Sequence, residues 1–456
     1  MTWDLARRHE HNVQTLRRSP LAEISGALGD LGTLLPLMTA LAVQHSVSLS
    51  STLVFSGLFN VATGIVFGIP LPVQPMKAIA AAAIASRASL RDTVAAGGLV
   101  SAAVLLLAAT GLLRWLAVHV PVPVGKGIQL GAGLSLIISA GNSLLGPLGW
   151  LQPSGLDNRL WALAAFVGLM ATQGFRGGRF FPYALVTFLV GLALALAVAL
   201  TAHAADHNVR LPGFALWRPR VLLPHWLSGE AWGMAVAQLP LTMLNSVVAV
   251  SALASDLLGG STTPASVTAL GCSVGLMNLV GCWFGAMPVC HGAGGLAAQY
   301  RFGARSGASV ILLGLFKTTL GLLLGETLVD LLGFFPRGVL GVLVLASGLE
   351  LAAVGNSLNQ GAPDLWEVAA NNVRNEAAAA TASDTDTQAN RKHRALSDDE
   401  RLERWTVMLT TTAGILATKN DAVGFAAGLL CHGAYRLADH YRQRWPAGGE
   451  GRPLLA

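Results

Sequence analysis

Charged residues are scarce in this chain of 456 residues, and their scarcity excludes most soluble folds. Asp, Glu, Lys and Arg make up 12% of the sequence, hydrophobic residues make up 53%, and the mean hydropathy is +0.56. An ordinary soluble domain carries about 25% charged residues. The composition therefore indicates an integral membrane protein, whose partner is the lipid bilayer. Its net charge of +6 is interpreted loop by loop and not as a nucleic-acid footprint.

Several functional signals are also missing. The four cysteines have neither CxxC nor zinc-site spacing, so we expect no disulfide framework and no metal site. Residues 1–20 are polar and basic, unlike a signal peptide. The sequence has no GxxxxGK[ST] phosphate loop, so we expect neither a nucleotide nor any other cofactor. By contrast, the 52 glycines suit close helix packing in a membrane.

Two Pro-rich segments resemble each other and interrupt the apolar sequence. One runs from Gly68 through Pro72-Val73 into a short run of small residues, and the other runs from Gly285 through Pro288-Val289. A second match relates Pro123-Val-Gly125 to Pro336-Arg-Gly338 and Gly141-Asn142 to Gly355-Asn356, at offsets of 213 and 214 residues against 216. Short, Gly/Pro-interrupted segments at matching places in two halves mark the substrate site of a secondary transporter.

Apolar length divides the chain into seven spans on each side of a polar stretch. The approximate spans are 21–43, 50–68, 75–86, 93–118, 124–145, 159–173, 180–202, 231–257, 265–284, 291–302, 306–330, 335–354, 404–418 and 420–437. An odd number of spans per repeat inverts the second repeat. We therefore predict an all-α polytopic membrane protein with a 7+7 inverted-repeat transporter fold, two short half-helices meeting at the midplane, and no C-terminal soluble domain.

The same division predicts the domain boundaries. We expect a basic cytosolic N-terminus at 1–20, a first repeat at 21–202, a connecting loop at 203–230, and a second repeat at 231–440. A hydrophilic insert at 356–403, rich in Ala, Thr, Asp and Asn at 377–390, is predicted to be disordered and cytosolic. The remaining 441–456 is predicted to be a cytosolic tail.

The distribution of basic residues gives the orientation. With the N-terminal arginines in the cytosol, most other basic clusters fall on the same side, as the positive-inside rule requires. The agreeing residues are Arg114, Lys126, Arg176, Arg179, Arg301, Arg305, Arg436, Arg442 and Arg444. Arg87, Arg91 and the basic residues of 203–230 disagree. Both termini are therefore expected to be cytosolic, in the plasma membrane or the vacuolar membrane.

Four motifs resemble those of the molybdate transporters that form a divergent branch of the sulfate permease superfamily. They are Gly29-Asp30-Leu31-Gly32-Thr33, Pro72-Val73-Gln74-Pro75-Met76-Lys77, Gln238 to Ser246, and Cys290 to Tyr300. The basic N-terminus and the long insert resemble fungal members most. The resemblance implies molybdate uptake, a core domain that moves against a gate domain, and the absence of the regulatory domain of typical sulfate permeases. Related folds also imply a homodimer.

The starts of the two short helices are the first candidate binding elements. Backbone N–H groups of Ala293, Gly294 and Gly295, next to Cys290 and His291, suit an oxyanion at a helix N-terminus. Close packing of small residues is the alternative. His291 either senses pH or bonds a neighbouring carbonyl.

Lys77, in the first turn of the other short helix, offsets the charge of a dianion or pairs with Asp30. Gln74 donates its amide to the oxyanion or closes the broken backbone. Met76 belongs to the same predicted site. Lys317 and Glu350 are interpreted as structural charges that can pair with each other.

Asp30 lies in the first span and is the candidate for carrying a coupling proton, with capping or pairing as the structural alternative. Thr33, one turn on, donates its hydroxyl to substrate or to its own helix. Gln238, Asn245 and Ser246 lie in the matching eighth span, and Asn245 falls near the position that corresponds to Asp30. Their amides and hydroxyl contact the substrate or bond between helices.

These features predict a gradient-driven transporter of tetrahedral oxyanions, with molybdate first and sulfate or tungstate as alternatives. A membrane enzyme needs a paired acid and base. Asp30 with His291 is the only candidate pair in the sequence and a weak one, so we expect no enzymatic activity. A non-transporting oxyanion receptor is the alternative from another class.

Overall fold

The computed structural model describes residues 2–174, 181–205, 209–258, 265–359, 365–368, 391–394 and 396–444. The predictions for Arg176, Arg179, the centre of the insert at 377–390, and the tail from 445 onward lie outside these residues. The chain divides into two compact units, 1–118 with 132–352 and 119–131 with 353–456. Each is described by itself below.

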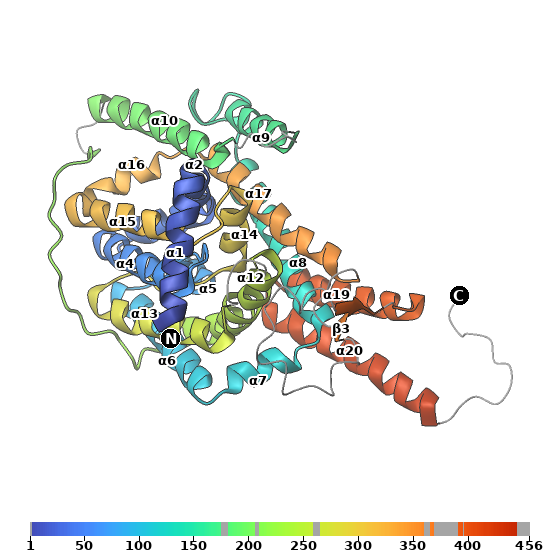
Figure 1. The fold of residues 1–456 in the computed structure, drawn as a ribbon. Coiled ribbons are helices and arrows are strands. Elements are labelled where there is room, and N and C mark those ends of the chain that lie inside the picture. Colours follow the sequence, from blue (N-terminus) through green and yellow to red (C-terminus); the bar gives the residue numbers. More distant parts are fainter. Residues whose placement is uncertain are drawn as a thin grey trace. The chain divides into compact units, whose positions relative to one another are not determined.

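The first half of the chain is helical apart from one short strand (Figure 1). Its elements are α1 (Thr2–Arg18), α2 (Pro20–Ala27), α3 (Leu31–Val43), α4 (Leu49–Phe67), β1 (Gln74–Pro75), α5 (Lys77–Ser86), α6 (Leu90–Ala109), α7 (Leu112–His119), α8 (Val122–Ser139), the π-helix η1 (Ala140–Leu145), α9 (Arg159–Gly174) and α10 (Tyr183–Ala205).

The second half repeats this order of helices, a short strand and a short helix. Its elements are α11 (Gly229–Leu241), the π-helix η2 (Thr242–Ala249), α12 (Val250–Leu258), α13 (Val267–Gly281), η3 (Cys282–Phe284), β2 (Val289–Cys290), α14 (Ala293–Arg301), α15 (Ala308–Leu323), η4 (Gly325–Leu328), α16 (Val329–Gly333), α17 (Arg337–Ala353), η5 (Val354–Ser357), β3 (Trp366–Val368), β4 (Arg391–His393), α19 (Asp398–Thr418) and α20 (Asp421–Arg444).

Eight helical segments in the described chain are long and apolar enough to cross a membrane. They are Pro20–Val43, Leu49–Phe67, Leu90–Ala109, Val122–Leu145, Tyr183–Ala204, Gly229–Leu258, Val267–Phe284 and Arg337–Ser357. Two predicted spans were wrong as continuous helices. The span at 93–118 ends at Ala109, where Gly111 with φ +77° turns the chain into α7. The span at 306–330 ends at Leu323 and bends by 106° into η4 and α16.

Side-chain caps explain where many helices begin. Ser48, Ser89, Ser228 and Ser266 each accept a hydrogen bond from the backbone N–H three residues on, at the starts of α4, α6, α11 and α13. A serine in this position satisfies an N–H that has no partner within the helix. Gly68, with φ +67°, ends α4 in the left-handed conformation and releases the chain toward β1.

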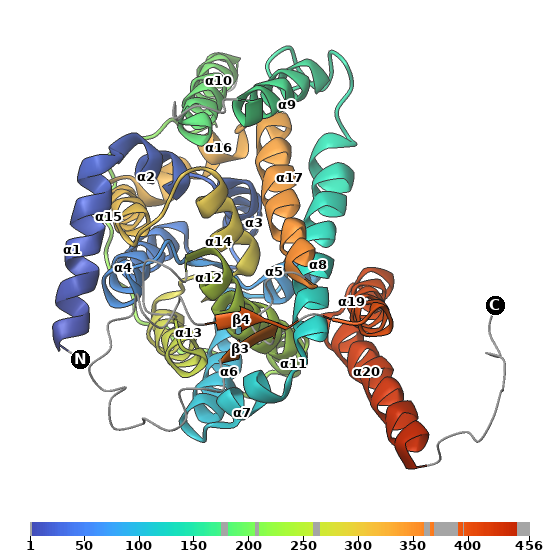
Figure 2. The ribbon, with the colours of Figure 1, turned by 45° about the vertical axis from the view of Figure 1, so that its right-hand side comes forward.

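Helix pairing in the first unit follows the predicted inverted repeat. Helix α4 packs along α15, and α13 packs along α6 (Figures 1 and 2). The offset of 216 residues carries α4 onto α13 and α6 onto α15, so the two pairs correspond to each other. Each half therefore contributes one helix to each of the two pairs, which is the arrangement that intertwined repeats produce.

Glycines allow the α4–α15 pair to approach closely. A Cβ added to Gly57 would lie 2.6 Å from the Gly314 carbonyl oxygen, and one added to Gly64 would lie 2.5 Å from the Gly307 oxygen. These separations leave no room for a side chain, so the two backbones are in direct contact.

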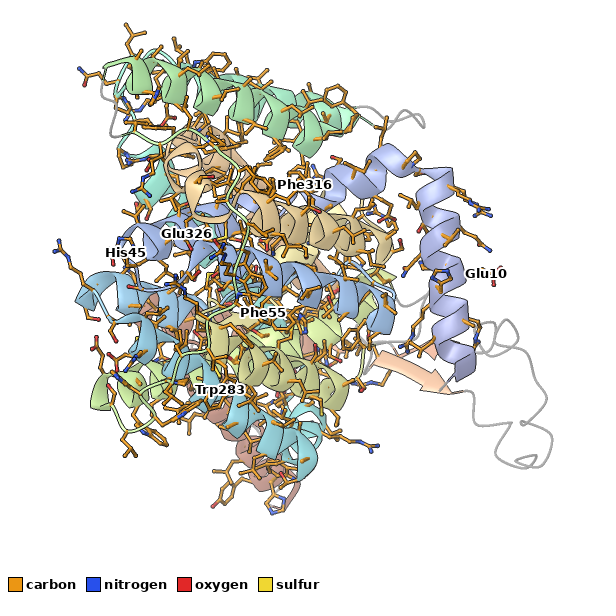
Figure 3. The ribbon with its side chains drawn as sticks, turned by 90° about the vertical axis from the view of Figure 1, so that its left-hand side faces the viewer. Glu10, His45, Phe55, Trp283, Phe316 and Glu326 are labelled. Carbon is orange, nitrogen blue, oxygen red and sulfur yellow. The ribbon has the colours of Figure 1, made fainter. Side chains whose placement is uncertain are left out.

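Residues 209–227 run without regular structure across the ends of this unit. Ala215 N donates to Leu323 O at 2.8 Å, and Trp217 stacks edge-on against Phe55 at 6.0 Å between ring centroids. Glu326 accepts hydrogen bonds from Ser48 Oγ at 2.9 Å and Ser50 N at 3.1 Å, and so ties η4 to the start of α4 (Figure 3 labels Phe55 and Glu326).

The second unit contains the helix pair α19 and α20. Gly424 and Gly428 of α20 approach α19 so closely that an added Cβ would lie 2.6 Å from Thr411 O and 2.0 Å from Thr411 Oγ1, respectively. The prediction that all of 356–403 is disordered was wrong at its edges. Strands β3 and β4 pair antiparallel, with Trp366 opposite His393, and α19 already begins at Asp398, capped by Ser397.

Candidate functional site

The two Pro-rich segments that the sequence matched to each other pair directly. Strands β1 and β2 are antiparallel, with Gln74 opposite Cys290 and Pro75 opposite Val289, and Met76 N donates to Pro288 O at 2.9 Å. Gln74 and Cys290 are 216 residues apart, the offset between the repeats. A residue and its repeat counterpart that face each other lie on either side of the pseudo-two-fold axis. Strands β1 and β2 therefore meet at the axis that relates the two repeats.

The short helices α5 and α14 begin immediately after these strands. Figure 2 shows α3, α5, α12 and α14 close together in this unit, and contacts join α3 to α5 and α12 to α14. The starts of two half-helices and the middle of the first and eighth spans therefore meet in one region, as the sequence predicted for a binding site.

Hydrogen bonds from neighbouring helices hold the broken backbone. His291 is fully buried, its Nδ1 donates to Pro72 O at 2.9 Å, and its Nε2 lies 3.0 Å from Ser273 Oγ. Asn278 of α13 exchanges two 2.7 Å hydrogen bonds with the backbone of Val289. Both ring nitrogens of His291 are thus occupied by protein groups, which favours its structural interpretation over substrate contact.

Asp30 lies in the break between α2 and α3, at the N-cap position of α3. Its side chain is 6% exposed, and Thr33 Oγ1 donates to its Oδ1. With its amide oriented so that donors meet acceptors, Gln74 donates from Nε2 to Asp30 Oδ2 at 2.8 Å and accepts from Gly292 N at 3.2 Å. Thr33 and Gln74 therefore both donate hydrogen bonds to Asp30, and Gln74 also links Asp30 to the start of α14.

Glycines bring Asp30 up to the N-terminal turn of α14. A Cβ added to Gly295 would lie 2.8 Å from Asp30 Oδ2, from the Gln74 side-chain amide and from Pro72 Cγ alike. One added to Gly292 would overlap the Gln74 amide. Carboxylates are stabilised at helix N-termini by the helix dipole, so this position suits Asp30.

Helix α14 presents its N-terminal N–H groups without protein acceptors. Leu296 N donates to Gly292 O at 3.0 Å, whereas within the described residues no acceptor is bonded to the N–H groups of Ala293, Gly294 and Gly295. Ala293 is 0% exposed, and Gly294 and Gly295 are also buried. Buried backbone N–H groups almost always have a partner, so three consecutive ones indicate a place for an anionic ligand.

The N-terminus of α5 differs, because the protein caps it. Gln238 of α11 accepts hydrogen bonds at Oε1 from Ala78 N at 2.8 Å and Ile79 N at 3.3 Å, and it donates from Nε2 to Thr242 Oγ1 at 2.9 Å. The sequence predicted two equivalent helix ends and offered Gln238 as a substrate ligand. The geometry instead makes Gln238 a cap and leaves α14 as the open end.

Lys77 is the first residue of α5 and is half-buried. Within the described residues its ammonium has no hydrogen-bond partner and no carboxylate within 4.0 Å, so the ion pair with Asp30 that the sequence offered is not formed. It still interacts electrostatically with Asp30 and with Cys290. Lys77 is therefore a cation beside the open end of α14 that no protein group neutralises at contact distance.

The eighth span is distorted where it passes this region. Residues 242–249 form the π-helix η2, a geometry that is frequent at functional sites. Within η2, Ser246 interacts with the Cys290 thiol, and Asn245 is 6% exposed with no hydrogen-bond partner on its Oδ1. Met76, at the N-cap of α5, is 1% exposed. The unpartnered atom of Asn245 is an acceptor, so it requires a donor such as water and is not by itself a contact for an oxyanion.

The sequence missed two contributors to this region. Lys317 of α15 interacts electrostatically with Asp30, and it does not pair with Glu350 as predicted, since Glu350 Oε2 lies 3.9 Å from Arg301 Nε. Leu136 of α8 lies over α14, with its Cδ1 2.7 Å from a Cβ added to Gly294. Only the position of Lys317 as a lone cation in an apolar span could have indicated its role.

The fold is that of a polytopic membrane protein with two intertwined repeats, whose broken segments meet at β1 and β2. The fold resembles that of a murine anion transporter, Solute Carrier 26 family member A9, solved in the inward-facing state, at 14% identity. The alignment covers 92% of this chain and 68% of that chain, with a TM-score of 0.54.

Sequence comparison identifies the family. Residues 22–136 and 230–351 match the family described as molybdate transporter of MFS superfamily. The chain is 39% identical to Molybdate transporter 2 of Arabidopsis thaliana, over 75% of this chain and 80% of that protein. It is 40% identical to Molybdate transporter 1 of the same plant, over 77% and 83%. The chain belongs to this family of membrane transporters, which are not enzymes.

Proposed function

We propose that the protein carries molybdate across a membrane, with the oxyanion bound at the N-terminus of α14. The observation that carries this proposal is the set of three N–H groups at Ala293, Gly294 and Gly295 that have no acceptor in the described structure. The names of the Arabidopsis relatives support molybdate as the substrate. Sulfate and tungstate are the alternatives, since they share the tetrahedral shape and the double negative charge.

The charges around α14 suit a dianion. The positive end of the helix dipole and the ammonium of Lys77 attract it. Cys290 and Ser246 line the same region through their mutual contact. We assign Gln74, Gln238, Thr33 and His291 to supporting roles, because protein groups already occupy their hydrogen bonds.

Proton coupling through Asp30 belongs to the same proposal. The Asp30 carboxylate lies beside the N-terminal turn of α14, where a bound dianion would repel it. A proton on Asp30 removes that repulsion, so binding of the proton and of the dianion should favour each other. The hydrogen bond from Gln74 holds the carboxylate in this place in the absence of substrate.

Movement of a core against a gate would then expose the site alternately to the two sides. We propose that the fifth to seventh and twelfth to fourteenth spans form the gate, which includes α8 and α17. Leu136 of α8 and Leu351 of α17 lie 2.7 and 3.9 Å from a Cβ added to Gly294. Withdrawal of these side chains would open the start of α14. We further propose cytosolic termini and a homodimer, in the plasma membrane or the vacuolar membrane.

Uptake of labelled molybdate by proteoliposomes tests the proposal. A transporter accumulates labelled molybdate inside the vesicles. Competition by unlabelled tungstate and sulfate then ranks its selectivity, and phosphate at equal concentration should not compete. A non-transporting receptor binds molybdate in detergent without moving it across the vesicle membrane. Binding without flux in vesicles that hold correctly folded protein would therefore refute transport and favour the receptor.

A further inference from the structure

Lys317 is a buried cation that the binding site described above does not contact. It lies in α15, its side chain is 3% exposed, and its Nζ donates to Asn60 Oδ1 of α4 at 3.0 Å. Within the described residues no carboxylate lies within 4.0 Å of it, because Glu350 is directed to Arg301. A cation inside a membrane protein is energetically costly and usually serves a function. The hydrogen bond to the neutral amide of Asn60 does not neutralise the charge of Lys317.

Helix packing fixes the position of this charge. Asn60 is fully buried, and a Cβ added to Gly314, one turn before Lys317, would lie 2.9 Å from Asn60 Cβ. On the next turn, a Cβ added to Gly321 would lie 2.8 Å from Val54 N. Because α4 and α15 are in backbone contact on both sides of Lys317, its ammonium stays at a constant place in the core.

The charge of Lys317 reaches the substrate site through apolar surroundings. Asp30 interacts electrostatically with both Lys77 and Lys317. Lys317 also lines a cavity of about 230 Å³ whose other lining residues are all Leu, Met, Phe or Pro, among them Leu28 and Leu31 next to Asp30. Such surroundings screen a charge weakly, so a protonated Lys317 attracts an anion in the neighbourhood of Asp30 without contact.

We propose that Lys317 determines the charge specificity of the site, making it prefer a dianion over a monoanion of the same shape. This inference rests on the proposed function. With Asp30 ionised and both lysines protonated, two cations and one carboxylate leave the empty site with one net positive charge. Without Lys317 this net charge is zero. Since a Coulomb energy is proportional to the charge of the ligand, the loss affects a dianion twice as strongly as a monoanion.

Competition between molybdate and perrhenate, a tetrahedral monoanion, tests this proposal. The ratio of their dissociation constants is measured on the purified full-length protein for the wild type and for Lys317→Met. We expect Lys317→Met to shift this ratio about tenfold toward perrhenate, as one charge acting through a partly apolar medium would. A ratio that stays unchanged, with both affinities equal to wild type or both reduced alike, would overturn the proposal.

Two further variants keep the result interpretable. Lys317→Met leaves Asn60 Oδ1 without a donor, so Lys317→Met/Asn60→Leu replaces the pair by apolar side chains and should show the same shifted ratio in a folded protein. Arg401→Met also removes one positive charge, from the exposed surface of α19, and should keep the wild-type ratio. If the wild type binds no molybdate, the proposed function itself fails and the inference with it. If it binds molybdate and the ratio does not shift, the inference alone fails.

Discussion

Gln74 and Asp30 are joined by a 2.8 Å hydrogen bond from the amide Nε2 to Oδ2, and the same amide accepts from the backbone N–H of Gly292. One side chain thus connects the break in the first span to the start of α14. Gln74 is 1% exposed, so water cannot replace it when it is removed. Its hydrogen bonds make the carboxylate and the open helix end one unit.

The first prediction concerns this connection. Gln74→Leu leaves both Asp30 Oδ2 and Gly292 N without a partner, which should lower the free energy of unfolding by about 1–3 kcal/mol and weaken molybdate binding. Thermal unfolding in detergent and a binding isotherm measure the two effects. Wild-type affinity in Gln74→Leu would show that the link plays no part in binding.

The cap on α5 gives a second prediction. Gln238→Leu removes the acceptor of Ala78 N and Ile79 N, and loss of a helix cap costs about 1–2 kcal/mol. The unfolding temperature should therefore fall. Gln14→Leu removes an exposed amide whose bond is local to α1, to Glu10, and should leave it unchanged. Equal stability of the two variants would contradict the capping role.

Neighbouring glycines of α14 should respond differently to the same change. A Cβ at Gly295 meets three atoms at 2.8 Å, including Asp30 Oδ2, whereas a Cβ at Gly294 meets the far end of the flexible Leu136 side chain. Gly295→Ala should impair folding. Gly294→Ala should fold but bind molybdate less tightly, because its methyl group covers the N–H groups, and Gly294→Val should not bind it. Yield, size-exclusion profile and affinity distinguish these cases, and tight binding by Gly294→Val would argue against α14 as the site.

Asp30→Asn tests proton coupling. Asparagine keeps an oxygen for the Thr33 hydrogen bond but cannot carry the proton. Accumulation of molybdate driven by an inward proton gradient should therefore fail, while exchange of labelled for unlabelled molybdate should continue. Both assays are run on one reconstituted preparation. Persistent proton-driven accumulation would exclude Asp30 as the coupling group, and loss of exchange as well would indicate a purely structural role.

Much of the architecture could be predicted because it depends on local pattern. Serine caps, apolar length and the Pro-rich breaks are visible in the residues themselves. The 216-residue offset that matches Pro72-Val73 to Pro288-Val289 also relates Gln74 to Cys290, which β1 and β2 bring opposite each other. The bends at Gly111 and after Leu323 were missed, because apolar sequence continues across both.

The roles of individual site residues were harder to predict. A glutamine in an apolar span has the same sequence signal whether it binds substrate or caps a helix, and only the contact of Gln238 with Ala78 N decides between them. Likewise, Lys317 donates a hydrogen bond to Asn60, which lies 257 residues away in the sequence, and no local pattern predicts such a contact. The open end of α14 follows from tertiary structure, through the absence of any residue that caps it in the described chain.

The position of bound molybdate is the most direct test of this account. A molybdate-bound structure with anomalous data collected at the molybdenum edge locates the metal atom of the oxyanion without reference to the protein. We expect a peak at the start of α14, with oxyanion oxygens about 3 Å from the N–H groups of Ala293 to Gly295 and with Lys77 turned toward them. A peak at any other place, with these N–H groups still unoccupied under saturating molybdate, would contradict it.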